Sequence, residues 1–224
     1  MRGFVPIYLL SIAVYISFIL RKDKDVKDLW VYEAFFKMWP CIVLTVEAHG
    51  KTNKAKAAAF AFALSALGDA ALCHNDYKET ELSFVLGLVA FLAAQWCYVY
   101  CFSKTKTKSR AGKQGSGLVR TLGCYAYAGG LYAFLYGNLG QIKIPVLFYC
   151  VSIATTFASS LDAASRSKHN QSSVFGILGA VLFVMSDSSL ALNMFVGPVV
   201  PHARLVIMST YWTAQLFLAL CFKG

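Results

Sequence analysis

Residues 82–102, LSFVLGLVAFLAAQWCYVYCF, form a run of 21 residues without a charged side chain. A helix that crosses the hydrocarbon core of a bilayer needs about 20 mostly apolar residues, so this run predicts a membrane span. The chain as a whole has the same character, because 58% of its 224 residues are hydrophobic and 14% are charged. Soluble domains are about half apolar and about a quarter charged, and disordered chains are less apolar still. The composition therefore excludes both classes.

We predict an all-α, polytopic membrane protein with eight transmembrane helices. The seven further spans are expected at residues 4–20, 31–46, 57–73, 118–136, 144–161, 174–193 and 203–222. The span at 31–46 is the weakest, since it contains Glu33, Lys37 and Pro40, but a seven-span arrangement would leave its apolar residues unexplained. We expect one integral membrane domain over residues 1–224, with halves at about 1–102 and 118–224 joined by a basic loop at 103–117.

The positive charge of the chain is interpreted as a topology signal. The formal net charge is +10, and the basic residues lie mostly between the apolar runs. In the eight-span arrangement, 13 Lys and Arg residues fall on the side of the two termini and seven on the other side. Cytoplasmic loops carry the excess of basic residues, so both termini are expected in the cytosol. No nucleic-acid partner is expected, and the sequence leaves the oligomeric state open.

A short pattern occurs twice in the chain. Residues 68–72, GDAAL, and 186–190, SDSSL, both read small-Asp-small-small-Leu, and an Ala-Gln pair follows in the next span at 94–95 and 214–215. Four spans separate the two copies, so they would point in the same direction across the membrane. The pattern indicates a possible 4+4 parallel internal repeat, although so short a match could also arise by chance.

Three ionisable residues inside predicted spans, Lys37, Asp69 and Asp187, are the candidate functional residues. A charge near the bilayer centre costs about 2.5–3.5 kcal/mol on insertion scales, whereas Glu33, Glu47 and Asp162 lie near span ends, where they could reach water. A rise of 1.5 Å per residue puts all three, together with Tyr149, roughly 6–9 Å below one membrane face. Two carboxyl groups and one ammonium in a shared pocket would favour one protonated and one ionised Asp, an acid/base pair. A proton or ion relay and a structural salt bridge are the alternatives.

Other common chemistries lack their motifs. The four His residues are predicted in loops or at span ends, no HExxH motif occurs, and the seven Cys form no CxxC pair. The chain also has no GxSxG, Walker or GxGxxG motif. We therefore expect neither a metal nor a cofactor.

Motifs in several separate spans resemble the YhhN family of membrane lysoplasmalogenases. They are KMWP at 37–40, ALGDAAL at 66–72, GLVAF at 87–91, FVMSD at 183–187, LALNMF at 190–195 and IMSTYWTAQ at 207–215. The resemblance covers about residues 37–220. The chain departs from the family in its fourth span, where the family usually has His three residues before a Tyr and this chain has Gln95 before Tyr98. A Gln side chain can form hydrogen bonds but cannot relay a proton.

The resemblance implies a multi-pass enzyme of the endoplasmic reticulum that hydrolyses the sn-1 vinyl ether of lysoplasmalogens. Its products would be a fatty aldehyde and glycerophosphoethanolamine or glycerophosphocholine. Such a reaction needs an acid and a base, so Asp69 and Asp187 are the predicted catalytic pair. Lys37 would tune their protonation or bind the lipid phosphate.

Further polar residues are predicted to support this site by orienting water or the glycerol hydroxyl. They are Tyr149, Asn193, Tyr211, Gln215 and, at the position of the family's His, Gln95. For each of them, ordinary hydrogen bonding between helices is the competing interpretation. The competing function is a non-catalytic lipid-binding, scramblase or transporter protein of the same fold.

Overall fold

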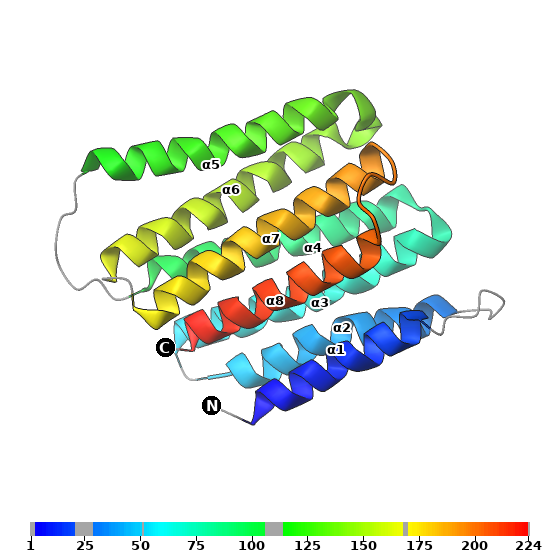
Figure 1. The fold of residues 1–224 in the computed structure, drawn as a ribbon, viewed down its shortest axis with the longest axis horizontal. Coiled ribbons are helices and arrows are strands. Elements are labelled where there is room, and N and C mark those ends of the chain that lie inside the picture. The colour runs from blue at the N-terminus through cyan, green and yellow to red at the C-terminus, as the bar shows by residue number, and fades with distance from the viewer. Residues whose placement is uncertain (1–2, 21–28, 51, 106–113, 168–169, 224) are drawn as a thin grey trace.

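The computed structural model describes residues 3–20, 29–50, 52–105, 114–167 and 170–223, and within these ranges the protein is all-helical. The eight α-helices of these ranges lie side by side along one long axis (Figure 1). Their bounds are α1 (Phe4–Leu20), α2 (Leu29–Ala48), α3 (Asn53–Lys78), α4 (Glu81–Ser103), α5 (Gln114–Leu135), α6 (Lys143–Arg166), α7 (Gln171–Phe195) and α8 (Ala203–Phe222). Two short 3-10 turns, η1 (Tyr136–Asn138) and η2 (Gly140–Ile142), connect α5 to α6. The predicted all-α class is confirmed.

Five of the described helical segments are long and apolar enough to cross a membrane, namely α3, α4, α6 extended by η2, α7 and α8. Helix α1 is apolar but shorter, with 17 residues. The chain is therefore an integral membrane protein. The roles of α1, α2 and α5 as further spans stay predictions.

The helices extend beyond the apolar runs from which they were predicted. The span expected at 57–73 lies inside the longer helix α3, which begins after Thr52, whose hydroxyl accepts a hydrogen bond from the Ala55 N–H at 3.1 Å. An N-cap of this kind starts a helix whatever the hydropathy of its first turn. The basic connector expected at 103–117 is shorter than predicted, because α5 already begins at Gln114; its residues 106–113 lie outside the described part.

Glycines allow two helix pairs to approach closely. A Cβ atom added to Gly68 of α3 would lie 2.6 Å from the Phe91 ring of α4, and one added to Gly87 of α4 would lie 2.9 Å from Leu72. In the other half, a Cβ on Gly179 of α7 would lie 3.0 Å from Leu218 of α8. Small residues are the usual means by which helices pack in lipid, where apolar surface is not driven together by water.

Aromatic side chains hold α4, α7 and α8 together in the core. The rings of Tyr98 and Phe222 stack at 5.8 Å between centroids, and Phe183 meets Tyr211 edge to face at 5.6 Å. Trp212, 1% exposed, accepts a hydrogen bond at its carbonyl from Tyr8 of α1 at 2.7 Å. By contrast, α5 lies at the edge of the bundle and packs mainly against α6 (Figure 1).

The bundle has two distinct ends. The start of α1 and the end of α8 share one of them, which we call the terminal end (Figure 1). There Lys223 forms an ion pair with Glu47 and lies over the Phe4 ring at 5.0 Å. The α3–α4 turn, η1, η2 and the α7–α8 connection lie at the opposite end, which we call the turn end.

Candidate active site

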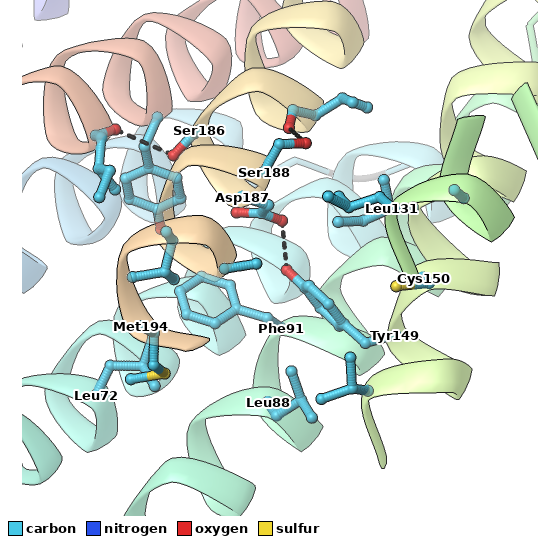
Figure 2. A pocket seen from close by; sticks show the side chains of 18 of the residues that line it. Leu72, Leu88, Phe91, Leu131, Tyr149, Cys150, Ser186, Asp187, Ser188 and Met194 are labelled. Atoms are coloured by element: carbon cyan, nitrogen blue, oxygen red, sulfur yellow. Dashed lines mark hydrogen bonds between the residues drawn. The ribbon is translucent and has the colours of Figure 1, made fainter. Parts of the chain in front are cut away.

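A cavity opens inside the bundle and is lined by seven of the described helices, α2 to α8. Its volume of about 130 Å³ is several times the roughly 10–15 Å³ that one water molecule requires. Most of the lining is apolar, as the side chains of Leu72, Leu88, Phe91 and Met194 illustrate (Figure 2). The polar or ionisable lining residues, apart from cysteines, are Lys37, Asp69, Asp76, Tyr127, Tyr149, Ser186, Asp187, Ser188 and Tyr211.

The charged residues of this cavity lie at similar depths on different helices. Lys37 is eight residues from the start of α2, Asp69 nine from the end of α3, and Asp187 eight from the end of α7. At 1.5 Å per residue, these positions are roughly 12–14 Å from the turn end. The structure thus brings the three residues, predicted from sequence to share a layer, to one cavity.

Asp187 receives a hydrogen bond from a tyrosine on the neighbouring helix. The Tyr149 hydroxyl donates to Asp187 Oδ2 at 2.7 Å across the α6–α7 contact (Figure 2). Both residues are half-buried and both line the cavity. This carboxyl group is therefore held in place while it still faces the open space.

Asp69 occupies a more enclosed position on the other side of the site. It is 2% exposed, and its Oδ2 accepts a hydrogen bond from the Tyr211 hydroxyl of α8 at 3.0 Å. The Cys41 thiol of α2 lies 3.8 Å from the same oxygen and 3.3 Å from the Tyr211 hydroxyl. The two aspartates therefore share a tyrosine partner type but differ in the exposure of their side chains.

Lys37 supplies positive charge to this site. Its side chain is 8% exposed, and it is the only Lys or Arg among the described residues that line the cavity. Asp69, Asp76 and Asp187 supply the carboxyl groups there. An ammonium in this position can attract either a carboxylate of the protein or an anionic group of a ligand.

The structure does not place Gln95, Asn193 or Gln215 in the cavity lining. Gln215 is fully buried and its Oε1 accepts a hydrogen bond from the Tyr98 hydroxyl at 2.6 Å. Asn193 Oδ1 accepts a hydrogen bond from the Val200 N–H at 3.1 Å and so ties the end of α7 to the following connection. Gln95 is 1% exposed and does not itself line the cavity, but it neighbours the hydroxyl of Tyr149, which does.

Glu33 is buried, so it does not reach water as its place near a span end would have allowed. It is 1% exposed and accepts hydrogen bonds from Arg204 Nη1 at 2.7 Å and from the Tyr77 hydroxyl at 2.5 Å. A second Arg204 nitrogen, Nη2, lies 3.7 Å from Asp76, a residue that lines the cavity. The cluster of Glu33, Tyr77, Asp76 and Arg204 therefore joins α2, α3 and α8 near the turn end.

Sequence reasoning also missed the hydroxyl groups that flank Asp187. The Ser188 hydroxyl pairs with the Tyr127 hydroxyl of α5 at 2.9 Å, and the Ser186 hydroxyl donates to the Ile207 carbonyl of α8 at 3.0 Å (Figure 2). The signal is present in the sequence, since both serines belong to the SDSSL pattern that contains Asp187.

These features define a helical integral membrane protein in which two aspartates face a shared, mostly apolar cavity. The YhhN family model matches residues 32–222, and the chain belongs to this family. No solved structure matches the chain.

Curated relatives of the chain carry the name lysoplasmalogenase. This chain is 33% identical to lysoplasmalogenase TMEM86A of Bos taurus over 205 aligned residues, and the alignment covers 85% of this chain and 78% of that protein. It is 32% identical over 156 residues to lysoplasmalogenase TMEM86B of Sus scrofa, covering 70% of this chain and 58% of that protein. It is also 32% identical over 165 residues to lysoplasmalogenase TMEM86A of Homo sapiens, and this alignment covers 70% of this chain and 60% of that protein. The matched part is thus less than two thirds of the pig and human proteins.

Proposed function

We propose that the protein is a lysoplasmalogenase, which hydrolyses the sn-1 vinyl ether of a lysoplasmalogen to a fatty aldehyde and glycerophosphoethanolamine or glycerophosphocholine. The names of its relatives support this activity. The observation that carries the proposal is the pair Asp69 and Asp187, which face one cavity and each accept a hydrogen bond from a tyrosine.

The chemistry of a vinyl ether fits two carboxyl groups. A carboxylic acid donates its proton to the alkene carbon distal to the ether oxygen, and the electron pair of the double bond forms the new C–H bond. The resulting oxocarbenium ion is stabilised by a nearby carboxylate. Water adds to the cationic carbon and gives up a proton, and the hemiacetal then collapses to the aldehyde and the glycerol hydroxyl. One proton enters and one leaves, so an acid and a base complete the cycle.

Asp69 and Asp187 supply these two roles in the proposal, one as the acid and the other as the carboxylate that faces the cation. Tyr149 and Tyr211 hold the two carboxyl groups by their hydrogen bonds. Lys37 binds the lipid phosphate or balances the charge of the carboxylates, because it lines the same cavity.

Three further residues are proposed to support the site from outside its lining. Gln95 neighbours Tyr149, and Gln215 hydrogen-bonds Tyr98 in the core between α4 and α8. Asn193 fixes the connection that leads into α8. All three would influence the aspartates through the positions of helices rather than through contact with substrate.

We also propose the membrane arrangement on which this function depends. All eight helices cross the membrane as one domain, with both termini in the cytosol and the endoplasmic reticulum as the compartment. The start of α1 and the end of α8 lie at the same end of the bundle (Figure 1), as expected for an even number of crossings. The close pairs α3–α4 and α7–α8, each of which carries one of the two aspartates, support the 4+4 repeat.

The test measures aldehyde release by the purified protein in lipid nanodiscs. A vinyl-ether lysolipid is compared with its alkyl-ether analogue, which has no double bond to protonate. Asp69→Asn and Asp187→Asn are each expected to lower kcat about 100-fold or more, the usual range for a lost general acid or base. Asp162→Asn is the matched control, because Asp162 is exposed and pairs with Arg166 away from the cavity.

Full activity in either folded aspartate variant would remove that residue from the mechanism. If the wild-type protein releases no aldehyde yet binds both lysolipids, the activity is refuted in favour of a non-catalytic lipid-binding protein of the same fold.

A further inference from the structure

The cavity differs in character on the two sides of its carboxyl groups. Toward the turn end, the lining includes Asp76, and Arg204 lies 3.7 Å from its carboxylate. Both side chains are more than one third exposed, at 35% and 38%. A ligand group on this side of the cavity therefore meets charged, hydrated side chains.

On the other side of the carboxyl groups, the cavity continues between α5, α6 and α7 as an apolar space. Val184 and Cys124 lie eleven residues from the turn end of their helices and Phe157 fourteen. A helical rise of 1.5 Å per residue puts them roughly 16–21 Å from that end, which is about 4–9 Å deeper than Asp187. The remaining deep lining residues include Ile153 and Ala154.

The polar groups that border this deeper part are already hydrogen-bonded. The Tyr127 hydroxyl pairs with that of Ser188 at 2.9 Å, and the Ser186 hydroxyl donates to the Ile207 carbonyl at 3.0 Å. A ligand in this space consequently meets mainly carbon atoms, and no charged side chain is among the described residues that line it. Hydrocarbon is the chemistry that such a surface binds.

We propose that this deeper part is a chain-binding subsite, so that a single-chain lipid binds in one orientation. Its phosphate headgroup lies toward Lys37, Arg204 and the turn end, and the start of its hydrocarbon chain lies among Cys124, Phe157 and Val184. The inference rests on the proposed function, and it deepens that function by giving the substrate a direction. The vinyl ether joins the headgroup to the chain, and this orientation puts it at the level of Asp69 and Asp187.

The test changes the volume of the subsite and measures selectivity for chain length. Cys124→Phe narrows the deep part of the cavity. Leu122→Phe is the matched control, because Leu122 is on the same helix but is 58% exposed and does not line the cavity. The probes are non-hydrolysable alkyl-ether lysolipids with chains of four and sixteen carbons, and their Kd values are measured by calorimetry on the protein in nanodiscs.

Each buried methylene contributes a factor of roughly four to binding, so excluding two of them weakens the sixteen-carbon ligand by about 16-fold. Cys124→Phe is therefore expected to lower the ratio of long-chain to short-chain affinity by about that factor, whereas Leu122→Phe leaves the ratio unchanged. An unchanged ratio in a folded Cys124→Phe variant, or an equal loss for both chains, would overturn the proposal.

Phe157→Ala provides a second, opposite perturbation. It enlarges the same space and is expected to raise the affinity for a branched sixteen-carbon chain relative to that for the straight sixteen-carbon chain. No gain for the branched chain would count against the subsite. Because binding is measured without turnover, the outcomes separate. A shifted ratio without aldehyde release refutes the enzyme function alone, and aldehyde release with an unshifted ratio refutes the orientation alone.

Discussion

A single methyl group at Gly68 should disturb both helix packing and the Asp69 site. In Gly68→Ala, the new Cβ would lie 2.6, 2.7 and 2.9 Å from three atoms of the Phe91 ring. Carbon atoms in contact lie about 3.5–4.0 Å apart, so the ring or helix α4 must move. Phe91 is 7% exposed and meets the Tyr211 ring edge to face at 5.9 Å. Displacement of Phe91 is therefore expected to move Tyr211, whose hydroxyl donates a hydrogen bond to Asp69.

The size of this effect follows from two opposing contributions. Overpacking a core costs about 1–3 kcal/mol, and three short contacts with a rigid ring favour the upper value. Replacing Gly by Ala inside a helix stabilises the folded state by about 1 kcal/mol. The net loss in the free energy of unfolding is therefore about 2 kcal/mol. At about 2–4 °C per kcal/mol for a chain of this size, Tm should fall by about 4–8 °C.

Gly130→Ala is the matched control, because a Cβ at Gly130 of α5 meets nothing within 4 Å. It keeps the helix-propensity gain without the clash, so this variant should equal or exceed the wild type in stability. Thermal unfolding in detergent, followed by circular dichroism, measures both variants, and aldehyde release reports the site. The reasoning is refuted if Gly68→Ala is as stable as Gly130→Ala. A double variant with Phe91→Leu should recover part of the loss, since the two positions are in contact.

Two further predictions separate residues that line the cavity from residues that do not. Tyr149→Phe removes the hydroxyl that donates to Asp187 at 2.7 Å. Because a hydrogen bond to a charged group contributes about 1.5–3 kcal/mol, kcat for aldehyde release should fall about 10- to 100-fold. An unchanged kcat would contradict a positioning role for Tyr149. Asn193→Ala removes the acceptor of the Val200 N–H, so Tm should fall by a few degrees, the effect of about 1 kcal/mol, while kcat per folded molecule is kept. A large kcat loss at full stability would instead place Asn193 in the site.

The depth of a residue along a helix could be predicted from sequence, whereas its direction around the helix could not. The rise per residue is fixed, so Lys37, Asp69 and Asp187 could be assigned to one layer before any packing was known. Direction is inferred from the contrast between an apolar and a polar face, and that contrast is weak in helices that are apolar on all sides. For that reason the sequence could not show that Gln95 and Gln215 lie outside the cavity lining, as they do in the structure.

Long-range pairing was the second limit of the sequence. Lys37, at the i+4 position, is the cation that the local sequence suggests as a partner for Glu33, a residue near a span end. Glu33 pairs with Arg204, which is 171 residues away, and the two meet only because α8 packs beside α2. Burial of a carboxylate is tolerated when a guanidinium and hydroxyl groups satisfy it. Such a pair can be recognised once the helix order is known, but a single sequence does not give that order.

The position of α5 has a consequence for how activity on a lipid should be expressed. This helix contributes Cys124, Ala128 and Leu131 to the cavity lining, yet it lies at the edge of the bundle and packs mainly against α6. In the proposed eight-span arrangement, one helix separates the cavity from surrounding lipid. A substrate that dissolves in the bilayer reaches such a wall by diffusing in two dimensions, so its mole fraction in the membrane, rather than its bulk molarity, is the variable that sets the rate. Diluting the substrate with inert lipid at constant total substrate should therefore slow the reaction.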